Sequence, residues 1–167
     1  MATITQPLRD EHKELFPHIE RLRTMADATG TTPLPELRRG VDEAYSFLTR
    51  HLIPHAQAEE RALYPVVDSL LGAPNATATM SRDHIEIGRL TEELGALRLR
   101  LAQVTAIDEG LARDLRRVLY GLYALVRVHF AKEEEIYLPL LDARLTPEAA
   151  QGMFAAMEAA AHDAKVP

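Results

Sequence analysis

The sequence contains no cysteine and no tryptophan, and only 5% of its 167 residues are aromatic. Without cysteine the chain cannot form disulfides, thiolate zinc sites or iron–sulfur clusters, and it has no thiol nucleophile. Any metal that it binds must therefore be held by nitrogen and oxygen atoms.

Two further features are missing, a basic surface pattern and a long hydrophobic run. The net charge is −6, and the two signs are interspersed, so no basic stripe predicts nucleic-acid binding. The apolar, uncharged run over residues 118–126 is too short to span a bilayer, and the N-terminus lacks the basic start and apolar stretch of a secretory signal. We expect a cytoplasmic protein that binds neither nucleic acid nor membranes.

What the sequence does contain favours helices. Apolar residues make up 47% of the chain, leucine and alanine are abundant, and runs of β-branched residues are scarce. The length suits one domain with a real core and is too short for two comfortable ones. We therefore predict a single all-α domain over residues 1–167, present as a monomer or homodimer.

A short motif occurs twice. In each copy a histidine is followed four residues later by the first of two glutamates, and a proline comes at the same offset: His55, Glu59, Glu60 and Pro65, then His129, Glu133, Glu134 and Pro139. Residues four apart lie on the same face of a helix, so the imidazole and the first carboxylate can bind one ion. Two such turns facing each other would form a pocket for two metal ions.

Two more histidines lie in apolar stripes of three-and-four spacing. His12 lies in such a stripe between Leu8 and Ala26, and His84 lies in another between Met80 and Val104. Each precedes one copy of the motif, so the chain appears as a duplicated unit of two helices. This pattern predicts two helical hairpins packed as an up-down four-helix bundle, with its core over residues about 5–142.

The same spacing assigns other inward residues and the helix breaks. On the last long helix it puts Leu125 and Ile136 inside with the motif residues. Pro17, Pro54 and Pro65 should kink their helices, because proline removes a backbone hydrogen bond and crowds the preceding turn. Thr146 can cap a short additional helix over residues about 146–164, packed on the outside.

With these residues assembled, the sequence resembles the hemerythrin-like family, the HHE cation-binding domains. The resemblance covers residues 8 to about 142. It rests on His12, His55, Glu59, His84, His129 and Glu133. In each half a tyrosine and a proline follow the motif. It implies an up-down bundle that holds two iron ions, bridged by carboxylates and by an oxo or hydroxo group. Oxygen, nitric oxide or peroxide would be the exogenous ligands.

The chain departs from the oxygen-carrying members of that family. Those proteins have two histidines four apart on the third helix, whereas Met80 and Gly88 flank His84 at that distance here. The one pair of histidines four apart in this chain is His51 and His55. No histidine has a glutamate three residues before it, and this absence disfavours a ferritin-like site. Four imidazoles and two carboxylates suit iron, and also zinc or manganese.

Five other side chains are candidates for additional ligands or for partners of the ligands. Glu60 and Glu134 adjoin the motif carboxylates, His51 precedes a motif histidine, Tyr64 can ligate a metal or carry a proton, and His18 follows the Pro17 kink. For each of them an ordinary core or solvated position is the alternative. Beyond the metal ligands we predict no catalytic residue.

Three functions are compatible with these residues. Two histidines per ion and two bridging glutamates leave coordination positions open, which favours a catalase-like reaction with hydrogen peroxide, or consumption of O2 or NO. The alternatives are a non-catalytic sensor or carrier of O2, NO or iron, and a structural helical bundle that binds zinc.

Overall fold

The structure, a computed structural model, describes residues 3–164, and all of its regular elements are helical. The elements are α1 (Gln6–Ala28), α2 (Leu34–Phe47), η1 (Leu48–Leu52), α3 (Ile53–Ala58), η2 (Glu59–Leu63), α4 (Tyr64–Leu71), α5 (Ala78–Gln103), α6 (Glu109–Lys132), η3 (Glu133–Tyr137), α7 (Leu138–Arg144) and α8 (Pro147–Asp163). The predicted all-α class is therefore confirmed. Within the described residues no helix is both long and apolar enough to cross a membrane.

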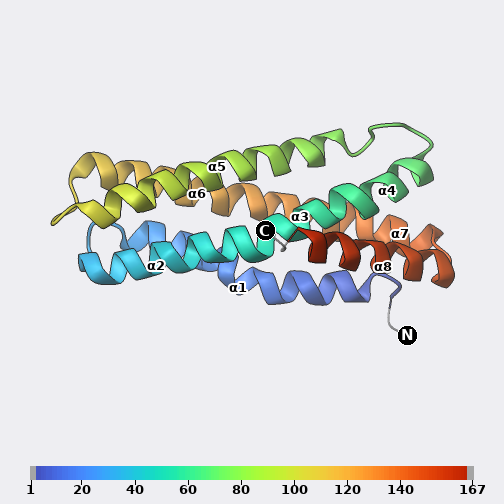
Figure 1. The fold of residues 1–167 in the computed structure, drawn as a ribbon. Helices are drawn as coiled ribbons and strands as arrows, with labels where there is room; N and C mark the ends of the chain where they lie inside the picture. Colours follow the sequence, from blue (N-terminus) through green and yellow to red (C-terminus); the bar gives the residue numbers. More distant parts are fainter. Residues whose placement is uncertain (1–2, 165–167) are drawn as a thin grey trace.

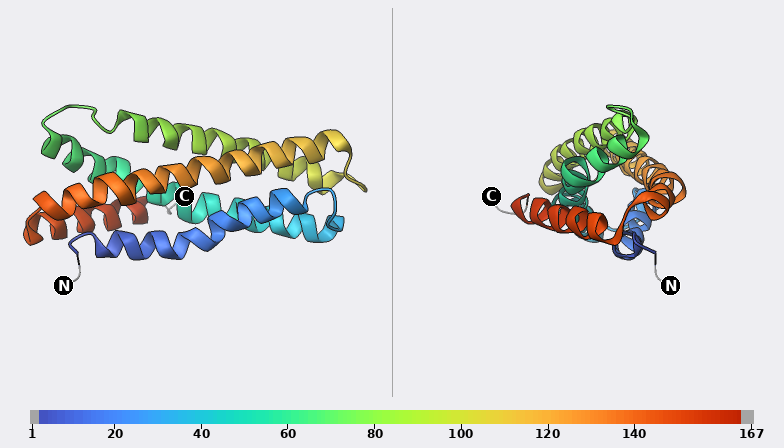
Figure 2. Two further views of the ribbon diagram at one scale, coloured as in Figure 1. Left: turned by 180° about the vertical axis from the view of Figure 1, so that it is seen from behind. Right: turned by 90° about the vertical axis from the view of Figure 1, so that its right-hand side faces the viewer.

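The long helices lie side by side as a bundle (Figure 1). α1 packs against α2 and α6, and α5 packs against α2 and α6, so each long helix has two neighbours. α8 lies along the outside and contacts α3 and η2 (Figure 2). The predicted additional helix at the C-terminal side is thus present in this structure.

Local signals in the sequence explain where several helices begin and end. Asp108 accepts a hydrogen bond from the backbone N–H of Leu111 at 2.7 Å, and Thr146 accepts one from Ala149 at 3.2 Å, so both residues cap helix N-termini. Gly72 ends α4 with a φ of 63°, in the left-handed region that glycine adopts without steric cost. The predicted cap at Thr146 is confirmed.

Three π-helical turns interrupt the helices, and each one ends two residues before a proline. η1 precedes Pro54, η2 precedes Pro65 and η3 precedes Pro139. A π turn is wider than an α turn, which makes room for the proline ring beside the carbonyl of the preceding turn. Pro17, in contrast, lies inside the continuous helix α1.

The apolar core has two parts with a polar layer between them. One cluster fills most of the bundle and includes Leu15 and Phe130, and the second includes Leu8, Met80 and the α8 residue Met157. The buried polar side chains between the two clusters are His12, His55, Glu59, His129 and Glu133. Two apolar clusters therefore enclose the residues of the candidate site.

Most predicted core positions are buried, but two on α6 and η3 differ. Val126, not Leu125, is fully buried, and Leu125 is half-buried. Ile136 is 58% exposed, whereas Leu138 is fully buried. The prediction for Ile136 was wrong because it assumed an α-helical turn of 100° per residue after Glu133, where the chain forms the wider turn η3.

Candidate metal centre

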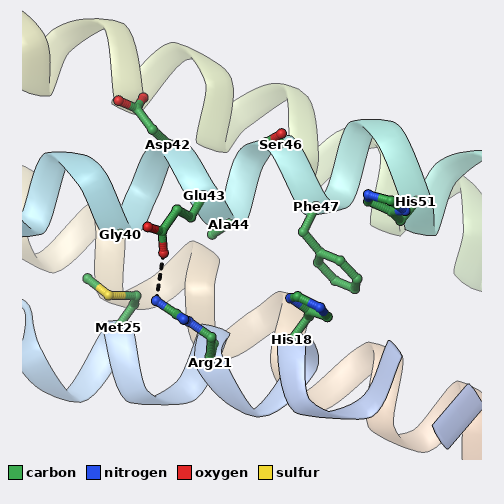
Figure 3. A pocket seen from close by; sticks show the side chains of 10 residues that line it. All are labelled: His18, Arg21, Met25, Gly40, Asp42, Glu43, Ala44, Ser46, Phe47 and His51. Carbon is green, nitrogen blue, oxygen red and sulfur yellow. Dashed lines mark hydrogen bonds and ion pairs between the residues drawn. The ribbon is translucent and has the colours of Figure 1, made fainter. Parts of the chain in front are cut away.

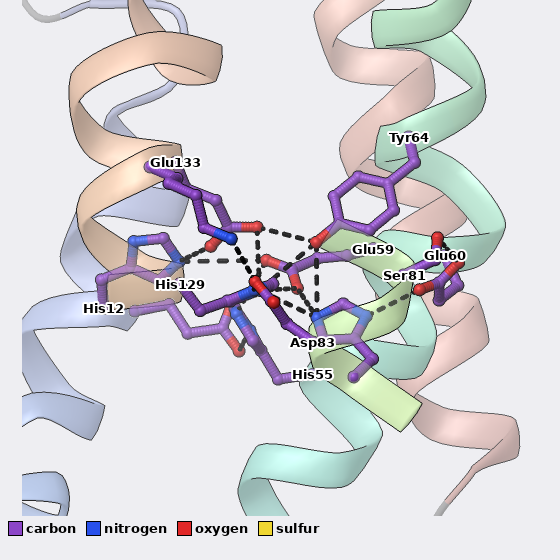
Figure 4. A network of polar contacts seen from close by, with 12 residues as sticks. His12, His55, Glu59, Glu60, Tyr64, Ser81, Asp83, His129 and Glu133 are labelled. Carbon is purple, nitrogen blue, oxygen red and sulfur yellow. Dashed lines mark hydrogen bonds and ion pairs between the residues drawn. The ribbon is translucent and has the colours of Figure 1, made fainter. Parts of the chain in front are cut away.

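Six side chains from four helical segments meet in the polar layer (Figure 4). α1 supplies a histidine, α3 and η2 supply the first motif, α5 supplies a histidine, and α6 and η3 supply the second motif. The residues are His12, His55, Glu59, His84, His129 and Glu133. All six were predicted as metal ligands from the sequence, and the structure brings them together.

The six residues form two groups in which the nitrogen and oxygen atoms lie within 4.8 Å of one another. One group contains His12, His55, Glu59 and Glu133, and the other contains Glu59, His84 and His129. Each group thus has two histidines, and Glu59 belongs to both. This division matches a pair of ions that share a carboxylate ligand.

Several donor atoms in the centre lack hydrogen-bond partners among residues 3–164, although they are buried. They include His12 Nε2, both carboxylate oxygens of Glu59 and Glu133 Oε2. Burying unpaired polar atoms, and charges above all, is costly unless a hydrogen bond or a metal ion compensates. The unpartnered atoms therefore fit metal ligands better than a structural polar network.

The inner nitrogen atoms also lie close to one another. His84 Nε2 is 2.9 Å from His129 Nε2, and His55 Nε2 is 2.9 Å from Glu59 Oε1, a contact that lacks the geometry of a hydrogen bond. Two imidazole lone pairs at that separation repel each other unless a proton or a metal ion lies between or beside them. Donor atoms that share one metal ion must come this close.

Each of the four histidines has an acidic partner at its outer nitrogen. The Nδ1 atoms lie 2.8–3.1 Å from a carboxylate oxygen, and the pairs are His12 with Glu134, His55 with Glu11, His84 with Glu60, and His129 with Asp83. In His12, His84 and His129 the carboxylate accepts the Nδ1 proton, which leaves the Nε2 lone pair directed at the centre, whereas His55 and Glu11 are in contact without the geometry of a hydrogen bond. Oriented imidazoles of this kind are typical of metal sites.

These outer partners follow the duplication of the chain. The acidic residue before the first histidine of each half contacts the motif histidine of the same half, as Glu11 and Asp83 do. The second glutamate of each motif contacts a histidine of the other half, as Glu60 and Glu134 do. Glu11 and Asp83 were not predicted as site residues, although the sequence shows an acidic residue directly before both His12 and His84.

Charges within the centre shift several pKa values. Burial alone would raise the pKa of Glu59, but the His55 charge and contacts from His12 and His129 hold it well below its usual range. Burial lowers the pKa of His129, but its contacts with Glu133 and Glu59 outweigh this and raise the pKa to about 10. In the absence of metal, these directions favour a protonated His129 beside an ionised Glu59.

Tyr64 reaches the centre, whereas its counterpart in the second half does not. Its hydroxyl donates a hydrogen bond to Glu133 Oε1 at 3.1 Å and lies 3.3 Å from the Nε2 atoms of His84 and His129. Burial, the main cause, and the nearby carboxylates raise its pKa, which favours the neutral phenol. In the second half, Leu138 occupies the equivalent position, five residues after Glu133, so only the first half supplies a phenol at this position.

The two remaining histidine candidates lie away from the centre. His18 and His51 are exposed and line a hollow of about 570 Å³ between α1 and α2 (Figure 3). The ring of His18 stacks on Phe47 with a centroid separation of 4.8 Å, and His51 lies on the same ring at 6.3 Å. Neither belongs to the groups that can hold a metal ion, so the structure does not support their prediction as ligands.

Comparisons with known proteins agree with this site. The family model of the hemerythrin HHE cation binding domain matches residues 3–141, which include all six residues of the centre. The zinc finger protein BRUTUS of Arabidopsis thaliana is 30% identical over 130 residues, which cover 78% of this chain and 10% of that protein. The chain thus spans about a tenth of the length of that relative. No solved structure matches. The predicted resemblance is confirmed, and the chain belongs to the hemerythrin HHE cation-binding domain family.

Proposed function

We propose that the chain is an up-down four-helix bundle that holds two iron ions and reacts with hydrogen peroxide, O2 or NO. One observation carries the proposal: three buried imidazoles and the partly buried His84, each in contact with an acidic side chain at its outer nitrogen, direct their inner nitrogens at two buried carboxylates. His12 and His55 would hold one ion, and His84 and His129 would hold the other. Glu59 would bridge the two ions, and so would Glu133, which also lies 3.4 Å from His129 Nε2.

The ligand count favours reaction over storage of a bound gas. Two imidazoles and two shared carboxylates supply fewer than six donors per ion, so positions remain for a small molecule. Iron at such a site supplies a reversible change of valence, which catalase-like chemistry requires. The protein itself orients the imidazoles, excludes bulk water by burial, and presents one neutral hydroxyl, that of Tyr64, as a proton donor beside Glu133.

Metal analysis combined with peroxide turnover tests this function. We expect two iron ions per chain, a coloured ferric protein, and oxygen evolution on addition of peroxide. The Glu59→Gln variant keeps the shape of the side chain but removes the charge shared by both groups, so it should lose most bound iron. The exposed Glu135→Gln variant makes the same chemical change nearby and should retain iron.

Other outcomes would identify the competing functions. A colourless protein with stoichiometric zinc would establish the structural alternative and overturn the iron proposal. Stable iron that binds O2 or NO reversibly without consuming peroxide would establish a sensor or carrier and overturn the catalytic one.

The setting of the protein is part of the proposal. We propose a cytoplasmic monomer or homodimer whose partners are small molecules, with neither nucleic acid nor membrane as a partner. The acidic composition, with a net charge of −6, supports the absence of a nucleic-acid partner. Cell fractionation and size-exclusion chromatography with light scattering test the location and the oligomeric state.

A further inference from the structure

A hollow of about 520 Å³ lies between α1 and α6 and opens to the surface beside the candidate metal centre. Its volume falls in the range of sites that bind small organic molecules, roughly 300–1,000 Å³. The residues that carry the argument are Arg9, Lys13, Phe16, Arg127 and Phe130. His12 and Glu134 of the candidate centre also line the hollow, whereas the proposed metal chemistry gives these five residues no role.

The floor of the hollow is aromatic and extends to the centre. Phe16 is 40% exposed, and Phe130 is almost fully buried beneath the hollow. Phe130 stacks on His12 with ring centroids 4.3 Å apart and an interplanar angle of 21°. Its centroid is also 5.8 Å from that of His55 and 6.3 Å from that of His129. A molecule on this floor would be one aromatic ring away from three histidines of the centre.

The rim of the hollow is positively charged, although the chain as a whole is acidic. Lys13 is exposed at the rim, and the Arg127 guanidinium lies over the Phe16 ring at 5.3 Å from its centroid. Glu134 also lines the hollow, but the partly buried Arg9 pairs with it and with Asp142, so these three charges offset one another. Arg127 also pairs with Glu20 at 3.0 Å, but its side chain is 47% exposed. Lys13 and Arg127 are therefore the cations that an incoming anion would contact.

We propose that this hollow binds a planar aromatic anion of the size of a flavin. The apolar, aromatic floor favours a flat ring system, and the two rim cations favour a phosphate or carboxylate attached to it. A neutral aromatic molecule would gain only the contact with the aromatic floor, and a small anion would gain only the attraction to the rim cations. The site requires no metal, so this proposal is independent of the identity of the ion in the centre.

Binding of flavin mononucleotide to the metal-free full-length protein tests the proposal. Quenching of flavin fluorescence at low salt should give saturable binding that weakens as salt is added, because rim charges are screened. Riboflavin, which has the same ring without the phosphate, should bind at least about tenfold more weakly. Lys13→Glu, Arg127→Glu and Phe16→Ala should each weaken binding of the mononucleotide.

The exposed Arg113 provides the matched control, since it lies on α6 like Arg127 but away from the hollow. Arg113→Glu makes the same charge change and should leave binding within about twofold of the parent protein. Circular dichroism of every variant verifies folding. Lack of saturation up to about 1 mM flavin mononucleotide would overturn the proposal. Equal binding of riboflavin, or equal losses in Arg113→Glu and Arg127→Glu, would also overturn it.

Discussion

The imidazoles of the centre owe their direction to residues that contact no ion. His12 is stacked on Phe130 and donates a hydrogen bond from Nδ1 to Glu134 at 2.8 Å. The stacking and the hydrogen bond together restrict rotation of the imidazole ring. Its Nε2 atom therefore stays directed at Glu133, 3.5 Å away. A ligand fixed before metal binds loses little conformational freedom on binding, which raises affinity.

Replacement of Glu134 by glutamine should weaken metal binding by about 10- to 100-fold, the usual effect of losing such a partner. Glutamine keeps the size of the side chain but removes the charge that favours the Nδ1–H tautomer of His12. Competition with a chelator of known affinity measures the change.

The neighbouring Glu135→Gln variant is the control for Glu134→Gln, because Glu135 is exposed and belongs to the same turn η3. It should bind metal as the parent does. If the two variants bound metal equally well, the carboxylate partner would have no role in fixing His12.

At the scale of elements, the π turns decide which side chains reach the centre. In an α-helix, residues five apart differ by about 140° and face apart. In η2 the backbone N–H of Tyr64 bonds to the carbonyl of Glu59, five residues earlier, which brings both side chains to the centre. The repeated prolines indicated irregular helices there, but α-helical spacing could not predict this rotation. For the same reason Ile136 was predicted inside and Tyr64 remained one of several candidates.

The outer helix α8 contributes to stability although it lies beyond the residues that the family model matches. Met157 is 6% exposed and packs in the second core cluster, against α3 and η2. Met157→Ala should lower the free energy of unfolding by about 2 kcal/mol or more, since it leaves a cavity beside these elements. Urea denaturation of the metal-free protein measures the loss.

Gln151→Ala on the same helix is the comparison, because Gln151 is exposed. It should change the free energy of unfolding by less than about 0.5 kcal/mol. Equal stability of Met157→Ala and Gln151→Ala would show that α8 is not docked on the bundle in solution.

At the scale of the whole molecule, the duplication made the centre predictable from one sequence. Two copies of one motif, each preceded by a histidine in an apolar stripe, place all six residues in one layer when the hairpins pack. What the sequence could not reveal are contacts between helices distant in the chain, such as Glu60 with His84. Such pairs depend on the rotation and depth of each helix, which α-helical spacing defines only to within about a residue.

The position of the centre between two apolar clusters links metal binding to the stability of the whole bundle. Without an ion, Glu59 and Glu133 remain fully buried, and the charge of Glu59 depends on protonated His55 and His129 for compensation. An ion present at a thousand times its dissociation constant adds about 4 kcal/mol. For a chain of this length that corresponds to a melting temperature about 8–16 °C higher.

Removal of the metal by a chelator should lower the melting temperature by this amount, which calorimetry before and after chelation measures. The Glu59→Gln variant should show little of this decrease. An equal melting temperature with and without metal would mean that the polar layer is satisfied without an ion, contrary to the function proposed for it.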